Sequence, residues 1–127
     1  MSHFSTVRTQ YTNKRLLIES LKNLGLTLTE HTTPVHLNTR WSDSATAHLV
    51  VSREQLNSGV DIGFLWQDNA YQLVADDYEL RQSGFKFPNF RQDLAVSYAI
   101  LTAQRQGLSL IEQKTENGQV QLVLQGV

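Results

Sequence analysis

Apolar residues spaced three and four positions apart predict a helix near the start of the chain. The residues of this stripe are Leu17, Leu21 and Leu24. They share one face of a helix over residues 13–24. Thr12 or Asn13 can accept a hydrogen bond from an N–H group of its first turn. Gly25 stands where a helix commonly ends on a left-handed residue.

A second stripe predicts a longer helix over residues 90–106. Its members are Phe90, Leu94, Tyr98 and Leu101. Asn89 and Gln92 have the spacing of a capping box, in which two side chains bond backbone N–H groups at the helix start. Gly107 is expected to end this helix as Gly25 ends the first one.

Alternating apolar residues predict a β-hairpin in the middle of the chain. They are Ile62, Phe64 and Trp66 before the turn, and Tyr71, Leu73 and Ala75 after it. Asp68 and Asn69 lie between the two runs and tolerate the positive φ that a tight two-residue turn requires. The segment is therefore expected to supply two antiparallel strands.

Asn117-Gly118 predicts a closing hairpin with strands over 108–114 and 119–125. Its second strand is expected to turn apolar residues inward and glutamines outward. The inward residues are Val120, Leu122 and Leu124, and the outward ones are Gln119, Gln121 and Gln125. No proline blocks this edge, so we expect it to pair with a partner protein or with its own copy in a homodimer.

The remaining segments predict shorter elements and complete the fold. Short strands are expected over 3–10, 26–29 and 47–52, a helical turn or loop over 53–59, and loops over 31–45 and 77–89. Two helices and an antiparallel-dominated sheet predict an α+β fold with both helices packed on one face. The length fits a single domain, residues 1–127.

The near-neutral charge argues against a nucleic-acid partner. The chain has 11 basic and 12 acidic residues, whereas nucleic-acid binders usually cluster Lys and Arg. It has no cysteine, which excludes disulfides and thiolate metal sites. No apolar run approaches the roughly 20 residues of a membrane span. We expect a soluble, cytoplasmic protein that does not insert into a membrane.

Three short segments resemble a known family. They are Met1-Ser2-His3-Phe4-Ser5, the helix end Leu24-Gly25, and Gly63-Phe64 followed by Tyr71-Gln72-Leu73-Val74-Ala75-Asp76. Over nearly its whole length the chain resembles the hypothetical chloroplast reading frame thirty-five family, whose function is unknown. The resemblance implies a small soluble protein of a cyanobacterial cytoplasm or a plastid stroma. It implies no catalytic residue.

Motifs for catalysis or cofactor binding are not recognisable in the sequence. It has no Gly-x-Ser-x-Gly elbow, no phosphate-binding loop and no Gly-x-Gly-x-x-Gly. The histidines are His3, His31, His36 and His48, and their spacing fits no common metal site. We therefore predict no catalytic residue, no metal and no cofactor. Whether the chain is an enzyme stays open, with a non-enzyme favoured.

The candidate binding site combines acidic and aromatic residues that follow the central hairpin with one histidine from the start of the chain. They are His3, Asp76, Asp77, Tyr78, Phe85 and Phe87. The carboxylates could perform acid–base chemistry or hold a cation, but capping of a turn explains them as well. The aromatic rings could line a pocket near residues 76–90, but core packing explains most of them. His3 is either solvated or part of this site.

Two functions from different classes fit these observations. The first is an accessory or adaptor protein that binds an unknown protein partner. The alternative is a small-ligand binder or an enzyme with an aromatic pocket near residues 76–90. An exposed apolar patch favours the first function, and an open pocket favours the second.

Overall fold

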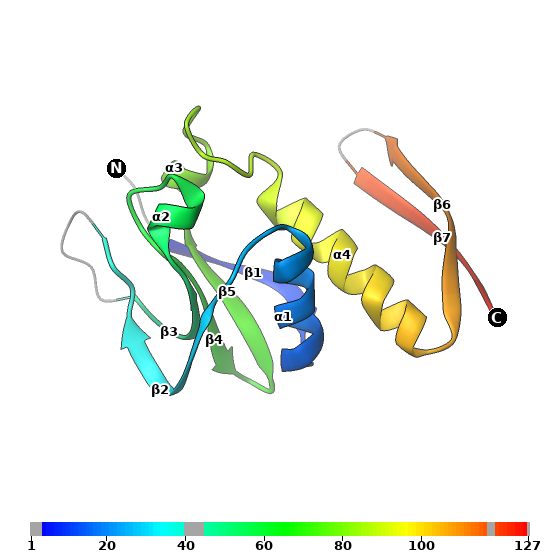
Figure 1. The fold of residues 1–127 in the computed structure, drawn as a ribbon, viewed down its shortest axis with the longest axis horizontal. Helices are drawn as coiled ribbons and strands as arrows, with labels where there is room; N and C mark the ends of the chain where they lie inside the picture. The colour runs from blue at the N-terminus through cyan, green and yellow to red at the C-terminus, as the bar shows by residue number, and fades with distance from the viewer. Residues whose placement is uncertain (1–3, 40–44, 117–118, 127) are drawn as a thin grey trace.

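The computed structural model describes residues 4–39, 45–116 and 119–126, and Figure 1 shows their arrangement. The elements in chain order are β1 (Phe4–Tyr11), α1 (Lys14–Asn23), β2 (Thr29–His36), β3 (Thr46–Val51), α2 (Arg53–Leu56), β4 (Ile62–Gln67), β5 (Ala70–Asp76), α3 (Asp77–Leu80), α4 (Phe90–Arg105), β6 (Leu108–Glu116) and β7 (Gln119–Gly126). The predicted α+β fold is confirmed. Both predicted helices are present, with ends within one residue of the expected ones.

The main sheet has five antiparallel strands in the order β1-β5-β4-β3-β2. The predicted central hairpin forms β4 and β5, and Asp68 and Asn69 take φ values of 56° and 63° in its turn. Strands β6 and β7 form a separate two-stranded sheet beside α4 (Figure 1). The expectation of one sheet was therefore wrong, because the closing hairpin packs on a helix instead of joining the other strands.

Helices α1 and α4 cover the same face of the main sheet and enclose one hydrophobic core. Its buried members include Leu17 and Leu21 of α1, Leu94 of α4, and Leu49, Val51, Phe64 and Leu73 of the sheet. Burying a leucine fully contributes about 1.5–3 kcal/mol, so this layer supplies much of the free energy of folding.

Tyr98 of α4 joins the two helices and the sheet. Its ring meets Tyr11 edge to face at 4.9 Å, and Tyr11 meets Phe64 in the same way at 6.2 Å. Its hydroxyl oxygen accepts hydrogen bonds from the backbone N–H groups of Thr12 and Asn13 at 3.1 and 3.0 Å. The Asn13 side chain in turn caps α1 by accepting from the N–H of Leu16, as the sequence predicted.

A smaller apolar cluster lies apart from that core. Leu37, Ala47 and Val60 are buried together here, beside Gly63 of β4. A methyl group at Gly63 would collide with the side chains of Ala47 and Leu37. The glycine therefore lets the chain between β2 and β3 lie close against the sheet.

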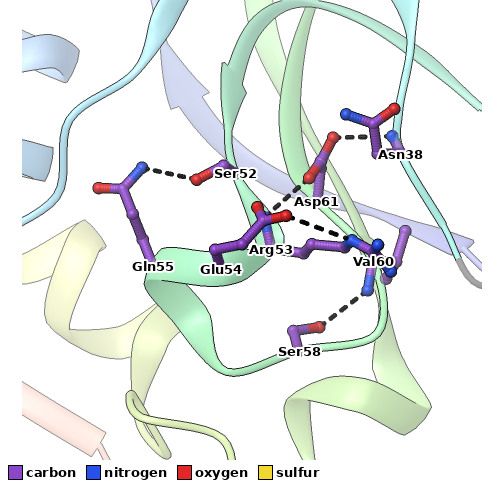
Figure 2. A network of polar contacts seen from close by, with 8 residues as sticks. All are labelled: Asn38, Ser52, Arg53, Glu54, Gln55, Ser58, Val60 and Asp61. Atoms are coloured by element: carbon purple, nitrogen blue, oxygen red, sulfur yellow. Dashed lines mark hydrogen bonds and ion pairs between the residues drawn. The ribbon is translucent and has the colours of Figure 1, made fainter.

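Asp61 ties this connection to the rest of the fold, as Figure 2 shows. Its buried carboxylate accepts from the backbone N–H groups of Asn38 and Arg53, each at 2.7 Å. The two donors belong to segments that the sequence places far apart. One carboxylate thus holds the beginning of the β2–β3 connection against the start of α2.

Four local predictions need correction. Residues Asp77–Leu80 form α3, where a loop over 77–89 was expected, because the Asp76 side chain caps this short helix. Strand β2 occupies Thr29–His36, where an irregular loop was expected, because pairing with β3 holds it extended. Residues 26–28 are not a strand, since the Gln55 side chain bonds both the N–H and the carbonyl oxygen of Thr27. Asn89 precedes α4, but its side chain makes no capping bond.

Replacing Tyr98 by phenylalanine tests the hydrogen bonds that connect α4 to the start of α1. We expect Tyr98→Phe to lower the free energy of unfolding by about 1–2 kcal/mol, because two backbone N–H groups lose their acceptor. Urea unfolding followed by circular dichroism measures it. Tyr78→Phe is the matched control, since Tyr78 is 49% exposed, and it should change stability by less than about 0.5 kcal/mol. Equal stability of the two variants would contradict the role of Tyr98.

Replacing Asp61 by asparagine tests the contact that its carboxylate makes with Asn38 and Arg53. We expect Asp61→Asn to cost about 2 kcal/mol, because an amide NH₂ then faces a backbone N–H and the ionic character of both bonds is lost. Asp68→Asn is the control, since this residue is exposed in a turn that asparagine also tolerates. An Asp61→Asn protein that unfolds at the wild-type urea concentration would show that the carboxylate does not stabilise the contact between the β2–β3 connection and α2.

Candidate functional site

The β2–β3 ladder is interrupted next to a hollow in the protein surface. The strands pair at Glu30 with Leu49 and pair again at Val35 with Ala47. Between these pairs, residues 31–34 of β2 lie opposite His48 alone. Pro34 has no N–H to donate to a ladder, so it suits such a bulge. The extra residues carry this part of β2 away from regular pairing.

The bulge borders an open cleft of about 460 Å³. Its walls come from the start of α1, from β2 and β3, and from the β4–β5 hairpin. The lining residues are Thr12, Lys14, Glu30, His31, Thr32, His48, Leu49, Trp66 and Tyr71. This volume falls within the range of pockets that hold small molecules.

Two aromatic rings form one side of the cleft. Trp66 of β4 pairs across the hairpin with Tyr71 of β5, and the ring centroids are 4.8 Å apart with an interplanar angle of 63°. Trp66 remains 43% exposed, although it lies on the same strand as the fully buried Phe64. A flat apolar surface is therefore open to a ligand here.

The His48 ring is oriented by a backbone hydrogen bond. Its Nδ1 accepts from the N–H of Trp66 at 3.0 Å. A neutral imidazole that accepts at Nδ1 carries its proton at Nε2, so the second nitrogen is a donor. His31, from the bulge, has its Nε2 3.0 Å from the hydroxyl oxygen of Thr29. The two histidines bring hydrogen-bonding groups to the side of the cleft formed by β2 and β3.

Lys14 and Glu30 form an ion pair at the edge of the cleft. The Lys14 Nζ lies 2.9 Å from a Glu30 carboxylate oxygen, and both side chains are half exposed. The hydrogen bond with Glu30, and then its negative charge, raise the pKa of the Lys14 ammonium above its ordinary value. Lys14 therefore stays protonated, and the two formal charges cancel.

The described residues contain no group of three or more His, Asp or Glu side chains arranged to hold a metal ion. The cleft brings Glu30, His31 and His48 to one hollow without forming such a group.

The structure places the predicted carboxylates in structural roles outside this cleft. Asp76 is buried and caps α3, because its carboxylate accepts from the N–H groups of Tyr78 and Glu79 at 2.9 and 3.3 Å. Asp77 forms an ion pair with Arg91 of α4. This capping is the alternative that the sequence offered for Asp76.

The predicted aromatic residues do not gather around one pocket. Phe85 is buried in the main core, and Phe87 packs against that core, where its ring lies 6.3 Å from that of Phe85. Tyr78 is exposed, and His3 lies outside the described residues. A hollow of about 230 Å³ borders Phe87 but none of the other predicted site residues.

The sequence reasoning missed the cleft because its residues come from distant segments. Lys14, His48 and Trp66 lie on different elements, and no local spacing connects them. Pro34 within an otherwise β-branched run was the available signal, since proline in a strand marks an edge or a bulge. The unexpected exposure of Trp66 becomes visible only in the folded chain.

Comparisons with known proteins place the chain in a family. In the described part of the chain, no helix is long and apolar enough to cross a membrane. No solved structure matches the sequence. It is 28% identical over 130 residues to "Uncharacterized protein ycf35" of Pyropia yezoensis, covering 98% of this chain and 97% of that protein. It is 30% identical over 131 residues to the protein of the same name in Guillardia theta, with the same coverage.

These similarities agree with the resemblance noted in the sequence. The family described as "Protein of unknown function (DUF1257)" matches residues 20–123, which include the cleft residues of β2, β3, β4 and β5. The chain therefore belongs to the DUF1257 family.

Proposed function

We propose that the protein binds an uncharged, planar heteroaromatic molecule in the cleft beside the β2 bulge. The observation that carries this proposal is the half-exposed Trp66 ring, which faces a hollow of ligand size together with Tyr71. Stacking of a base-like ring on an aromatic side chain is worth about 1–3 kcal/mol, which suits a flat ligand.

Hydrogen-bonding groups on the other walls favour a heteroaromatic ring over a hydrocarbon. His48 is held with its Nε2 as the donor, and it can meet a ring nitrogen or carbonyl oxygen of the ligand. Thr12, Thr32 and the Lys14–Glu30 pair add donors and acceptors around the same hollow. A ligand with polar atoms at its ring edge would satisfy these groups.

Charge argues against a multiply charged anion. A phosphate-rich ligand would have to compete with Glu30 for the only lysine that lines the cleft in the described structure. A helix N-terminus could assist an anion, but the first turn of α1 has the Asn13 oxygen already bound to the Leu16 N–H. The balance of charge therefore favours an uncharged ligand.

A protein-binding accessory role, predicted from the sequence, is a second candidate. Its support is the β6–β7 hairpin, in which Ile111 and Leu124 are 58% and 38% exposed. The relatives named ycf35 in Pyropia yezoensis and Guillardia theta support action in a plastid stroma, and a cyanobacterial cytoplasm is the alternative that the sequence resemblance implies. Ligand binding in the cleft and protein binding by the hairpin would use different surfaces.

Two-dimensional NMR of the tryptophan indole N–H signals tests the ligand proposal. We use adenosine and riboflavin as uncharged planar probes and inorganic pyrophosphate as an anionic one. The Trp66 signal, assigned by its loss in Trp66→Phe, should shift with at least one planar probe and not with pyrophosphate. Trp66→Ala should weaken binding of that probe about tenfold, measured by the probe's own NMR signals.

Tyr78→Ala is the matched control, because Tyr78 is an aromatic residue of similar exposure, 49% against 43% for Trp66, that does not line the cleft. It should bind the probe as the wild type does. A Trp66 signal that no planar probe shifts would reject the proposal. So would a shift with pyrophosphate alone, or equal binding by the wild type and Trp66→Ala.

A further inference from the structure

We propose that strand β7 pairs antiparallel with β7 of a second copy of this chain, around a two-fold axis at Leu122. The two hairpins would then form one four-stranded sheet. This inference concerns a surface separate from the cleft and does not depend on the ligand proposed for it.

The β6–β7 hairpin is poorly buried for a folded element. It extends along the far side of α4 from the main sheet (Figure 1). Wherever burial is described between Leu108 and Gly126, no side chain is buried, and Ile111 and Leu124 are largely open. A two-stranded sheet is only marginally stable in water unless a helix or further strands cover it. The contact with α4 gives partial cover, and a second hairpin would extend the sheet.

The two edges of the hairpin differ in a way that favours pairing at β7. Strand β6 carries Glu112 and Lys114, whose charged groups lie 3.5 Å apart, and its ladder is shifted at Ile111. Charged side chains and bulges are the features that keep edge strands from pairing. Strand β7 has neither a charged residue nor a proline, and none of its own pairs breaks the register from Gln119 to Val123.

The sequence of β7 is self-complementary when two copies of the strand pair antiparallel. Residues directly opposite in antiparallel strands lie on the same face, so a two-fold axis must pass through a residue. An axis at Leu122 places Val120 opposite Leu124 of the second copy and Gln121 opposite Val123. The apolar residues Val120, Leu122 and Leu124 then continue across both copies on one face.

Within each hairpin the same face already carries one apolar pair, Leu110 opposite Leu124. Leu122 lies opposite the polar Gln113 and can gain an apolar neighbour from a second copy. Each copy contributes only one strand edge to this contact. The surface area that it buries is therefore small compared with the roughly 1,200–2,000 Å² buried in a stable interface. The dimer should therefore be reversible and concentration-dependent.

Sedimentation equilibrium over roughly two decades of micromolar concentration tests this dimer. The wild type should rise from the monomer mass of 14.4 kDa towards twice that value. Leu122→Lys alone and Leu122→Glu alone should stay near 14.4 kDa, because the axis places like charges directly opposite each other. An equimolar mixture of the two variants should again form a dimer, because opposite charges then meet.

Gln113→Lys is the matched control, because Gln113 lies opposite Leu122 on β6 and away from the proposed edge. It should dimerise as the wild type does. Circular dichroism of each variant shows whether it is folded, and recovery in the mixture shows that the single variants stay monomeric because of charge repulsion and not because they unfold. A wild type that remains a monomer throughout would overturn the proposal. So would folded charge variants that fail to dimerise when mixed.

Discussion

The contact between Tyr98 and the start of α1 is the interaction on which the arrangement of layers depends. The Tyr98 ring reaches Phe64 of the sheet through Tyr11, and its hydroxyl accepts from the two residues that precede α1. One side chain thus sets α4 against both the sheet and the other helix. It also fixes the beginning of α1, from which Thr12 and Lys14 reach the cleft.

The buried apolar residues of the sheet belong to two separate clusters. Both long helices lie on one face, while Leu37, Ala47 and Val60 form a small separate cluster. Near the turn of the β4–β5 hairpin, Trp66 lines the cleft together with residues of the β2 bulge and stays 43% exposed. The cleft therefore lies at the border of the hydrophobic core. Along β4, the buried Phe64 belongs to this core, and Trp66, two residues further on, lines the cleft.

Sequence reasoning succeeded where the signal was local. The leucine stripe of α1, its Asn13 cap and the Asp68-Asn69 turn each depend on residues a few positions apart, and each is confirmed. It failed where pairing across the chain overrides local preference. Pro34 and its neighbours predicted a loop, yet pairing with β3 makes that segment a strand with a bulge. Of the aromatic residues near 76–90, Phe85 belongs to the core and Phe87 borders a hollow of about 230 Å³, while the cleft of about 460 Å³ is lined by residues from other segments.

The proton position on His48 reports the geometry of the cleft most directly. The bond from the Trp66 N–H to Nδ1 joins β3 to β4 next to the ladder pair of Leu49 with Phe64, so it requires that these two strands lie as described. Long-range ¹H–¹⁵N NMR at about pH 8, above the usual pKa range of histidine, distinguishes the two neutral tautomers. We predict the Nε2–H form for His48. A predominant Nδ1–H form would contradict the bond to β4 and the cleft built on it.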